Sequence, residues 1–126
     1  MGIEKLLTSC AEAGENFPEE IRGLGVAIKI NPVDGKAYLA KDNASAVGVL
    51  HEACTTDRPV MSGDIITYIQ EGRANLYVDP AETVAIKRGE KVGISAKGFA
   101  KKDAAGKFEA MSEGKPGGMV WANIRI

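Results

Sequence analysis

Long apolar runs and an excess of basic charge are both missing from this sequence of 126 residues. No stretch approaches the roughly 18 consecutive apolar residues of a membrane-spanning helix, so no membrane partner is expected. The 16 Lys and Arg residues are balanced by 17 Asp and Glu residues, which leaves a formal net charge of -1. Proteins that bind nucleic acid usually carry a basic excess that neutralises phosphates, so nucleic acid is not expected as a partner either.

Cysteine and aromatic residues are scarce as well. The two cysteines, Cys10 and Cys54, are too few for a disulfide framework. Residues 1–10 have neither the charged region nor the long apolar region of a signal peptide, so we expect synthesis in the cytoplasm. Aromatic residues make up 6% of a chain that is 44% hydrophobic. The core must therefore consist mainly of Val, Ile, Leu, Ala and Met.

The single histidine restricts the chemistry that the chain could perform. Any Ser-His-Asp or Cys-His arrangement must use His51, and Cys54 follows it three residues later. A thiol and an imidazole this close could serve a zinc ion or a thiolate nucleophile, but a tetrahedral zinc site needs four ligands and Cys10 is the only other thiol. We interpret His51 as a strand-end residue beside a buried cysteine, and we predict no catalytic residue, no metal site and no cofactor.

Gly23 and Gly25 resemble the first two glycines of a dinucleotide-binding fingerprint. The third glycine is missing, however, and no strand–helix unit surrounds the pair. We therefore interpret these two glycines as turn residues.

Glycine itself is abundant, since the 15 glycines exceed the average share of about 7%. Asp34-Gly35 favours a β turn, which predicts a hairpin between residues 26–30 and 36–40. In the closing run, Val120 alternates with Trp121, which we expect to be a core anchor rather than an interface residue. Further strands are expected at residues 46–51, 65–70, 74–78, 84–86, 92–95 and 119–126, with a tight connection at residues 71–73. Short strands at intervals of about 8 to 12 residues predict an all-β fold, a small β-sandwich or barrel-like domain over residues 24–126.

The first 23 residues follow a different pattern. Ile3, Leu6, Leu7 and Cys10 lie on one face at helical spacing, which weakly predicts a short helix over residues 2–12. The apolar side chains of the segment are too sparse to anchor it firmly. We therefore predict an N-terminal arm or short helix over residues 1–23, preceding a β-rich domain over residues 24–126.

Several sequence segments of the β-rich part resemble segments of the capsid decoration (cement) proteins of tailed bacteriophages. The resemblance is one of pattern and extends over about four fifths of the chain. The first two segments are Asp-Gly-Lys-Ala at 34–37 and Ala-Val-Gly-Val-Leu at 46–50. The others are a Gly-Asp turn followed by a strand and a second turn at 62–72, a similar segment at 86–98, and the closing strand at 120–126.

The resemblance implies a non-enzymatic structural protein, often trimeric, on local or quasi-threefold positions of an icosahedral shell. Its partners would be the major capsid protein and two further copies of itself, in a homotrimer. It would be located on the capsid surface of the virion and would stabilise the shell against internal DNA pressure. The N-terminal segment would then contact a neighbouring subunit or the capsid. Its candidate interface residues are Ile3, Leu6, Leu7, Phe17 and Ile21.

Two other functions stay open from the sequence. One is a small β-barrel carrier or ligand-binding domain, although Lys36, Lys87 and Lys97 lack the flanking residues of a lipoyl or biotinyl lysine. The other is an enzyme that uses His51 and Cys54, for which thiol reactivity at neutral pH would be the discriminating observation.

Overall fold

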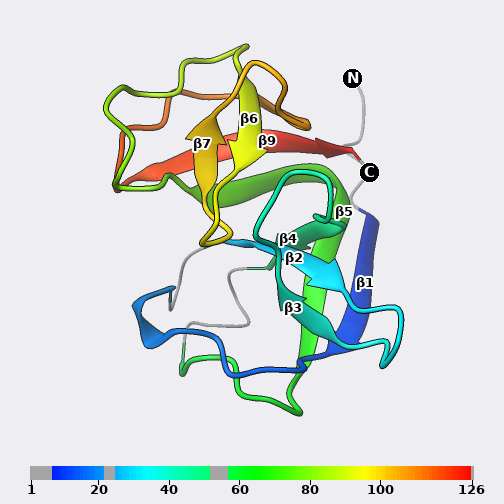
Figure 1. The fold of residues 1–126 in the computed structure, drawn as a ribbon. Helices are drawn as coiled ribbons and strands as arrows, with labels where there is room; N and C mark the ends of the chain where they lie inside the picture. The colour runs from blue at the N-terminus through cyan, green and yellow to red at the C-terminus, as the bar shows by residue number, and fades with distance from the viewer. Residues whose placement is uncertain (1–6, 22–24, 52–56, 126) are drawn as a thin grey trace.

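The computed structural model describes residues 7–21, 25–51 and 57–125. The described residues form an all-β fold without an α-helix, as the glycine-punctuated strand pattern predicts, and the sheet is strongly curled (Figure 1). The elements are β1 (Leu7–Glu12), the 3-10 turn η1 (Glu19–Ile21), β2 (Ala27–Ile30), β3 (Ala37–Leu39), β4 (Gly48–Leu50), β5 (Ile65–Tyr77), β6 (Lys91–Ile94), β7 (Ala100–Lys102), β8 (Phe108–Ala110) and β9 (Met119–Arg125).

The strands form one antiparallel sheet in the order β3-β2-β4-β5-β9-β8-β6-β7, with β1 also paired to β5. The predicted hairpin is confirmed as β2–β3, and its turn contains Gly35 with a φ of 70°. Residues 84–86 do not form a strand; Ile86 makes only an isolated bridge to Gly114. The apolar composition of residues 84–86 suggested a strand, but only Ile86 is buried and Val84 is 53% exposed.

The long strand β5 connects the two halves of the molecule. The expected tight connection at residues 71–73 is wrong, because the chain continues through it as strand. The register with β1 shifts between Leu7 and Thr8, opposite Gln70, and Gly72 has a φ of 121°. A bulge and a glycine with positive φ let a strand bend without ending. Glu71 pairs with both Leu7 and Arg125, so β1 and β9 meet there.

The buried side chains form two clusters. The first core gathers side chains mainly from β5, β6, β8 and β9, including Leu76, Phe108 and Val120, and also contains Ala27 of β2 and Val49 of β4. The second core gathers side chains from β2, β3, β4 and the first half of β5, including Ile28 and Tyr68. Aliphatic residues and alanine dominate both clusters, as the low aromatic content predicts.

The N-terminal segment differs from its sequence-based prediction. Residues 7–12 form strand β1 rather than a helix, because Thr8, Ser9 and Cys10 are weak helix formers and pairing with β5 overrides a faint helical period. Phe17 and Ile21 are 3% and 1% exposed and belong to the second core. They are therefore not available as anchors on another molecule. Ile3 and Leu6 lie outside the described residues.

Hydrogen bonds also join the same segment to the rest of the domain. Phe17 N–H donates to the carbonyl oxygen of Val60 at 2.8 Å, and Ser62 N–H donates to Asn16 Oδ1 at 2.8 Å. Because residues 13–21 contribute both side chains and backbone partners to the second core, the described part of residues 1–23 packs as part of the β domain.

The loop before β5 is held by an ion pair. Both guanidinium nitrogens of Arg58 contact Asp64, at 2.7 and 2.9 Å, and Met61 N–H also donates to the same carboxylate at 2.8 Å. These contacts hold the pKa of Asp64 below its ordinary value of 3.8, and the hydrogen bond from Arg58 has the largest effect. At a pH above the ordinary carboxyl pKa, the lowered pKa of Asp64 stabilises the folded protein. That stabilisation is lost as the pH falls through the pKa of the folded state.

Replacing Arg58 by Gln should raise the pKa of Asp64 toward its ordinary value, because the charged hydrogen-bond donor is removed. The pKa is measured by NMR titration of the side-chain carboxyl carbons. Asp42 is the internal control, since hydrogen bonds from Ser45 lower its pKa and do not involve Arg58. An Asp64 pKa that is the same in the variant and the parent would contradict the assignment.

Candidate interaction surfaces

His51 follows β4 and is half-buried, and its backbone N–H donates to the carbonyl oxygen of Thr67 at 3.0 Å. Cys54 lies outside the described residues, so the structure does not place the two groups relative to each other. Cys10 is an exposed free cysteine on β1, with its Sγ 3.7 Å from Thr67 Oγ1. Within the described ranges, no three His, Cys, Asp or Glu side chains are grouped so that they could hold a metal ion.

Two further features bear on the functional classes considered from the sequence. Lys36, at the end of the β2–β3 turn, forms an ion pair with Glu12 on β1 at 3.0 Å rather than extending from a hairpin tip. No helix in the described part of the chain is long and apolar enough to cross a membrane.

In the part of the chain that the structure describes, the outer edge of β1 is open at Thr8 and Cys10, whereas just beyond its C-terminal end Ala13 bridges Ala37 of β3 and Gly14 N–H donates to the carbonyl oxygen of Ala37 at 2.8 Å. Ala13 N–H donates to Asp64 at 2.7 Å and Ala13 accepts from Gly63 at 2.8 Å, so the backbone of residue 13 faces the β5 side. Backbone groups alternate along a strand, and the register is regular from Thr8 onward, so those of Thr8 and Cys10 point away from β5. Among the described strands, β1 pairs only with β5.

Of the features that usually prevent strand addition, β1 has neither Lys nor Pro, although its register with β5 shifts between Leu7 and Thr8. Natural sheets protect edges with Lys, Pro or bulges that turn the edge away. The β1 sequence, Leu-Thr-Ser-Cys-Ala-Glu, contains neither residue, and Leu7 is 53% exposed beside it. Of the interface residues that the sequence suggested, Leu7 is therefore the one that the structure leaves exposed within the described residues.

A second surface lies on β9 and the second half of β5. On one face of these strands, side chains such as Leu76, Val120 and Ile124 are buried in the first core. Tyr77 and Met119 lie at one end of the opposite face, and the rest of that face, which we call the Trp121 face, has polar side chains around one indole. It consists of Glu71, Arg73, Asn75, Trp121, Asn123 and Arg125.

The expectation that Trp121 anchors the core is wrong, because its side chain is 42% exposed. It pairs across the strands with Asn75, and it shares its side of β9 with Asn123 and Arg125. Strict alternation with Val120 and Ala122 already assigns Trp121 to the polar face. A general preference for burying tryptophan conflicted with that signal, and the alternation was the better guide.

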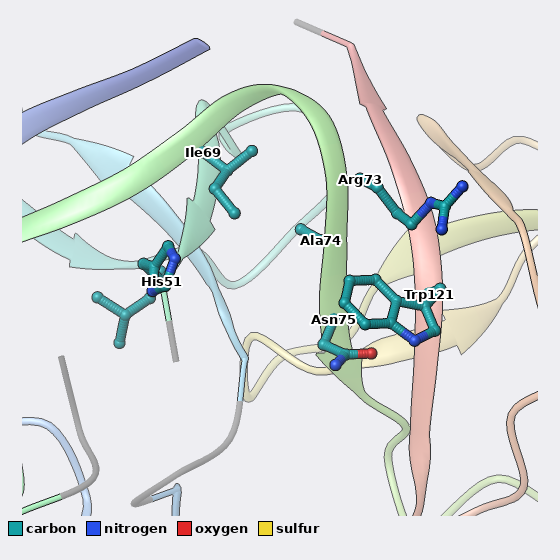
Figure 2. A pocket seen from close by; sticks show the side chains of 7 residues that line it. His51, Ile69, Arg73, Ala74, Asn75 and Trp121 are labelled. Atoms are coloured by element: carbon teal, nitrogen blue, oxygen red, sulfur yellow. The ribbon is translucent and has the colours of Figure 1, made fainter. Parts of the chain in front are cut away.

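A hollow of about 110 Å³ opens at one side of the Trp121 face. Figure 2 shows the Trp121 ring and Asn75 on one side and His51 on the other, with Ile69 and Ala74 between them. Leu50 and Arg73 complete the lining. Among the described residues of the lining, Arg73 carries a full positive charge.

A different depression is lined by Gly89, Glu90, Lys91, Lys102 and Ala104, and two of these charges pair with each other. Lys102 Nζ lies 2.9 Å from Glu90 Oε2, and Lys87 N–H donates to Glu90 Oε1 at 2.7 Å. The Lys87 hydrogen bond and then Lys102 lower the pKa of Glu90. Glu90 and Lys102 therefore satisfy each other within the protein.

Comparison with known proteins identifies a similar fold. No protein-family model and no curated protein matches the chain. Among solved structures, the crystal structure of the N base of the head fiber gp8.5 of bacteriophage phi29 matches with a TM-score of 0.53 and 18% sequence identity. The match covers 95% of this chain and 94% of that chain. At this identity the likeness concerns the fold.

Proposed function

We propose that this chain is a structural, non-enzymatic protein of a tailed-phage head, which binds the outer surface of the major capsid protein and stabilises the shell. The observation that carries the proposal is the fold likeness to a phage head-fiber base, which extends over nearly the whole of both chains. The resemblance of residues 24–126 to capsid decoration proteins supports the same role independently.

The β1 edge is the docking element in this proposal. Thr8 and Cys10 point their backbone groups outward, and an extended segment of the capsid protein would add to them as a further strand. Leu7 supplies exposed apolar surface next to that edge. A homotrimer would present three such edges, so contacts that are modest one at a time would retain the protein through multivalency.

The direct test mixes the purified protein with phage heads that lack it. Co-sedimentation measures binding, light scattering gives the number of copies in the soluble oligomer, and the temperature at which heads release DNA measures stabilisation. We expect saturable binding, trimers on the particle and a higher release temperature. Absence of binding to any such head would refute the proposed function.

A proline at residue 10 should separate docking from folding. The N–H of Cys10 points away from β5, so Cys10→Pro removes an outward donor and keeps the β1–β5 hydrogen bonds. We expect a melting temperature within a few degrees of the parent and capsid affinity at least about tenfold lower, or about 1.4 kcal/mol.

Cys10→Val is the matched control for this prediction, because it removes the thiol and keeps the backbone donor. It should bind as the parent does. If Cys10→Pro remains folded and binds equally well, then docking does not use the β1 edge, and a different surface of the β domain must be responsible.

A further inference from the structure

The strands around the second core form a circle that is incomplete beside β1. β1, β5, β4, β2 and β3 follow one another around this core, and among the described residues the circle closes where Ala13 bridges Ala37 of β3. The ion pair between Lys36 and Glu12 joins the same two segments (Figure 1). Both contacts lie at the C-terminal end of β1, so the rest of its outer edge is left without a neighbouring strand in the described part of the chain.

Two half-buried side chains mark the place where the second core is thinly covered. Ala11 on β1 and Ile30 on β2 pack against this core without being fully enclosed. Ala11 lies two residues before Ala13, and Ile30 pairs with Ala37, so both residues flank the bridge that closes the circle. Ala11 contributes only a methyl group to the cover. A larger apolar side chain placed beside it would therefore remove further apolar surface from water.

The two sides of β1 differ in chemistry. Ala11 pairs with Ile66, whose side chain is buried in the second core, so this side of β1 faces the core. Thr8 and Cys10 lie on the other side, which is exposed. Directly opposed residues of neighbouring strands share a face of the sheet. A strand that adds to the edge of β1 would consequently have one side turned to the second core and the other turned to water.

We propose that the capsid segment that adds to β1 is a short strand of alternating chemistry, with Val, Ile or Leu opposite Ala11 and polar residues opposite Thr8 and Cys10. The inference rests on the proposed function and on docking through the β1 edge. The apolar side chain of the segment covers the thin margin of the second core, and the polar side chains remain in water. Because the bridge at Ala13 ends the open edge, the segment pairs with no residue of β1 beyond Glu12.

Two peptides of defined sequence test the alternation without any capsid. The first is the acetylated and amidated peptide Thr-Val-Thr-Val-Thr-Lys, and the second has serine in place of both valines. NMR titration of the labelled protein follows the backbone amides of Thr8 and Cys10, which form the main-chain hydrogen bonds of strand addition. Both amides should shift, with an affinity for the valine peptide at least about tenfold higher, because buried apolar side chains contribute at least that factor. Equal affinity for the two peptides, or no shift with either, would overturn the proposal.

Ala11→Leu tests the same contact on phage heads, because the new side chain occupies the position of the proposed partner residue. We expect binding to heads at least about tenfold weaker in co-sedimentation, with a melting temperature within a few degrees of the parent. Cys10→Leu is the matched control, since it introduces the same side chain one residue away on the exposed side of β1, and it should bind as the parent does. Ala11→Val replaces Ala11→Leu if the latter is not folded, and it should change binding in the same direction.

The outcomes separate this inference from the proposed function. If the parent protein does not bind heads, the proposed function fails, and the peptide titration alone decides whether the β1 edge selects an alternating segment. If the parent binds heads and a folded Ala11→Leu or Ala11→Val variant binds equally well, the proposed function stands and the inference is wrong. If Cys10→Leu weakens binding as much as Ala11→Leu, the two sides of β1 are not distinguished by the partner, and the alternation is again contradicted.

Discussion

Phe17→Ala should lower the free energy of unfolding of the isolated protein by about 3–5 kcal/mol. The Phe17 ring is 3% exposed in the second core, where Ile21 and Val60 are also buried. Truncation removes its contacts and leaves a cavity, which the backbone hydrogen bond from Phe17 to Val60 keeps from collapsing freely. Urea denaturation followed by circular dichroism measures the change.

The control for this prediction comes from the same segment. Leu7→Ala truncates a side chain that is 53% exposed, so it should change the free energy of unfolding by no more than about 0.5 kcal/mol. A large difference between the two variants would establish residues 13–21 as part of the domain core. If Phe17→Ala is as harmless as Leu7→Ala, the segment is an appended arm, as its sparse apolar residues suggested.

Gly25→Ala should destabilise the protein by about 3 kcal/mol or more, or prevent folding. A Cβ at residue 25 would lie 1.7 Å from the carbonyl oxygen of Asn75 on β5. That oxygen belongs to the backbone of a paired strand, so it cannot move aside without disturbing the β5–β9 ladder. The hydrogen bond from Tyr77 N–H to Gly25 at 2.9 Å holds the two segments together at the same point.

Gly14→Ala is the comparison for this steric argument. A Cβ at residue 14 would lie 2.3 Å from Cζ of Tyr38, which is the far end of a side chain that can rotate away. Its cost should be about 1 kcal/mol, mainly from the hydrogen bond between Tyr38 and Asp34. Thermal melts of both variants measure the two losses of stability. A Gly25→Ala protein as stable as the parent would contradict the close approach of residue 25 to the backbone of Asn75.

These two glycines illustrate what a sequence pattern can and cannot convey. Gly25 belongs to a Gly-x-Gly pattern that suggested a turn, whereas the structure assigns it to a contact between backbones about fifty residues apart in the chain. By contrast, Gly35 has a positive φ of 70° in the turn that Asp34-Gly35 predicted. Turn chemistry is local and can be predicted from a few residues, but a close approach between distant segments cannot.

The sequence by itself determined the all-β class, the β2–β3 hairpin, the closing strand with its alternating faces, and a core of aliphatic residues. These features depend on neighbouring residues: strand period, turn residues and composition. In β9 the alternation would also have placed Trp121 on the polar face, had it been given precedence over the general preference for buried tryptophan.

Only the tertiary structure decided the rest. Residues 7–12 become a strand because β5 lies beside them, and Phe17 and Ile21 become core residues because β2, β3 and β4 provide a face for them to cover. The hollow unites His51 with Trp121 only after β4, β5 and β9 have paired. Such pairings join residues that are far apart in sequence, and their energy comes from burial and hydrogen bonds that no local pattern specifies.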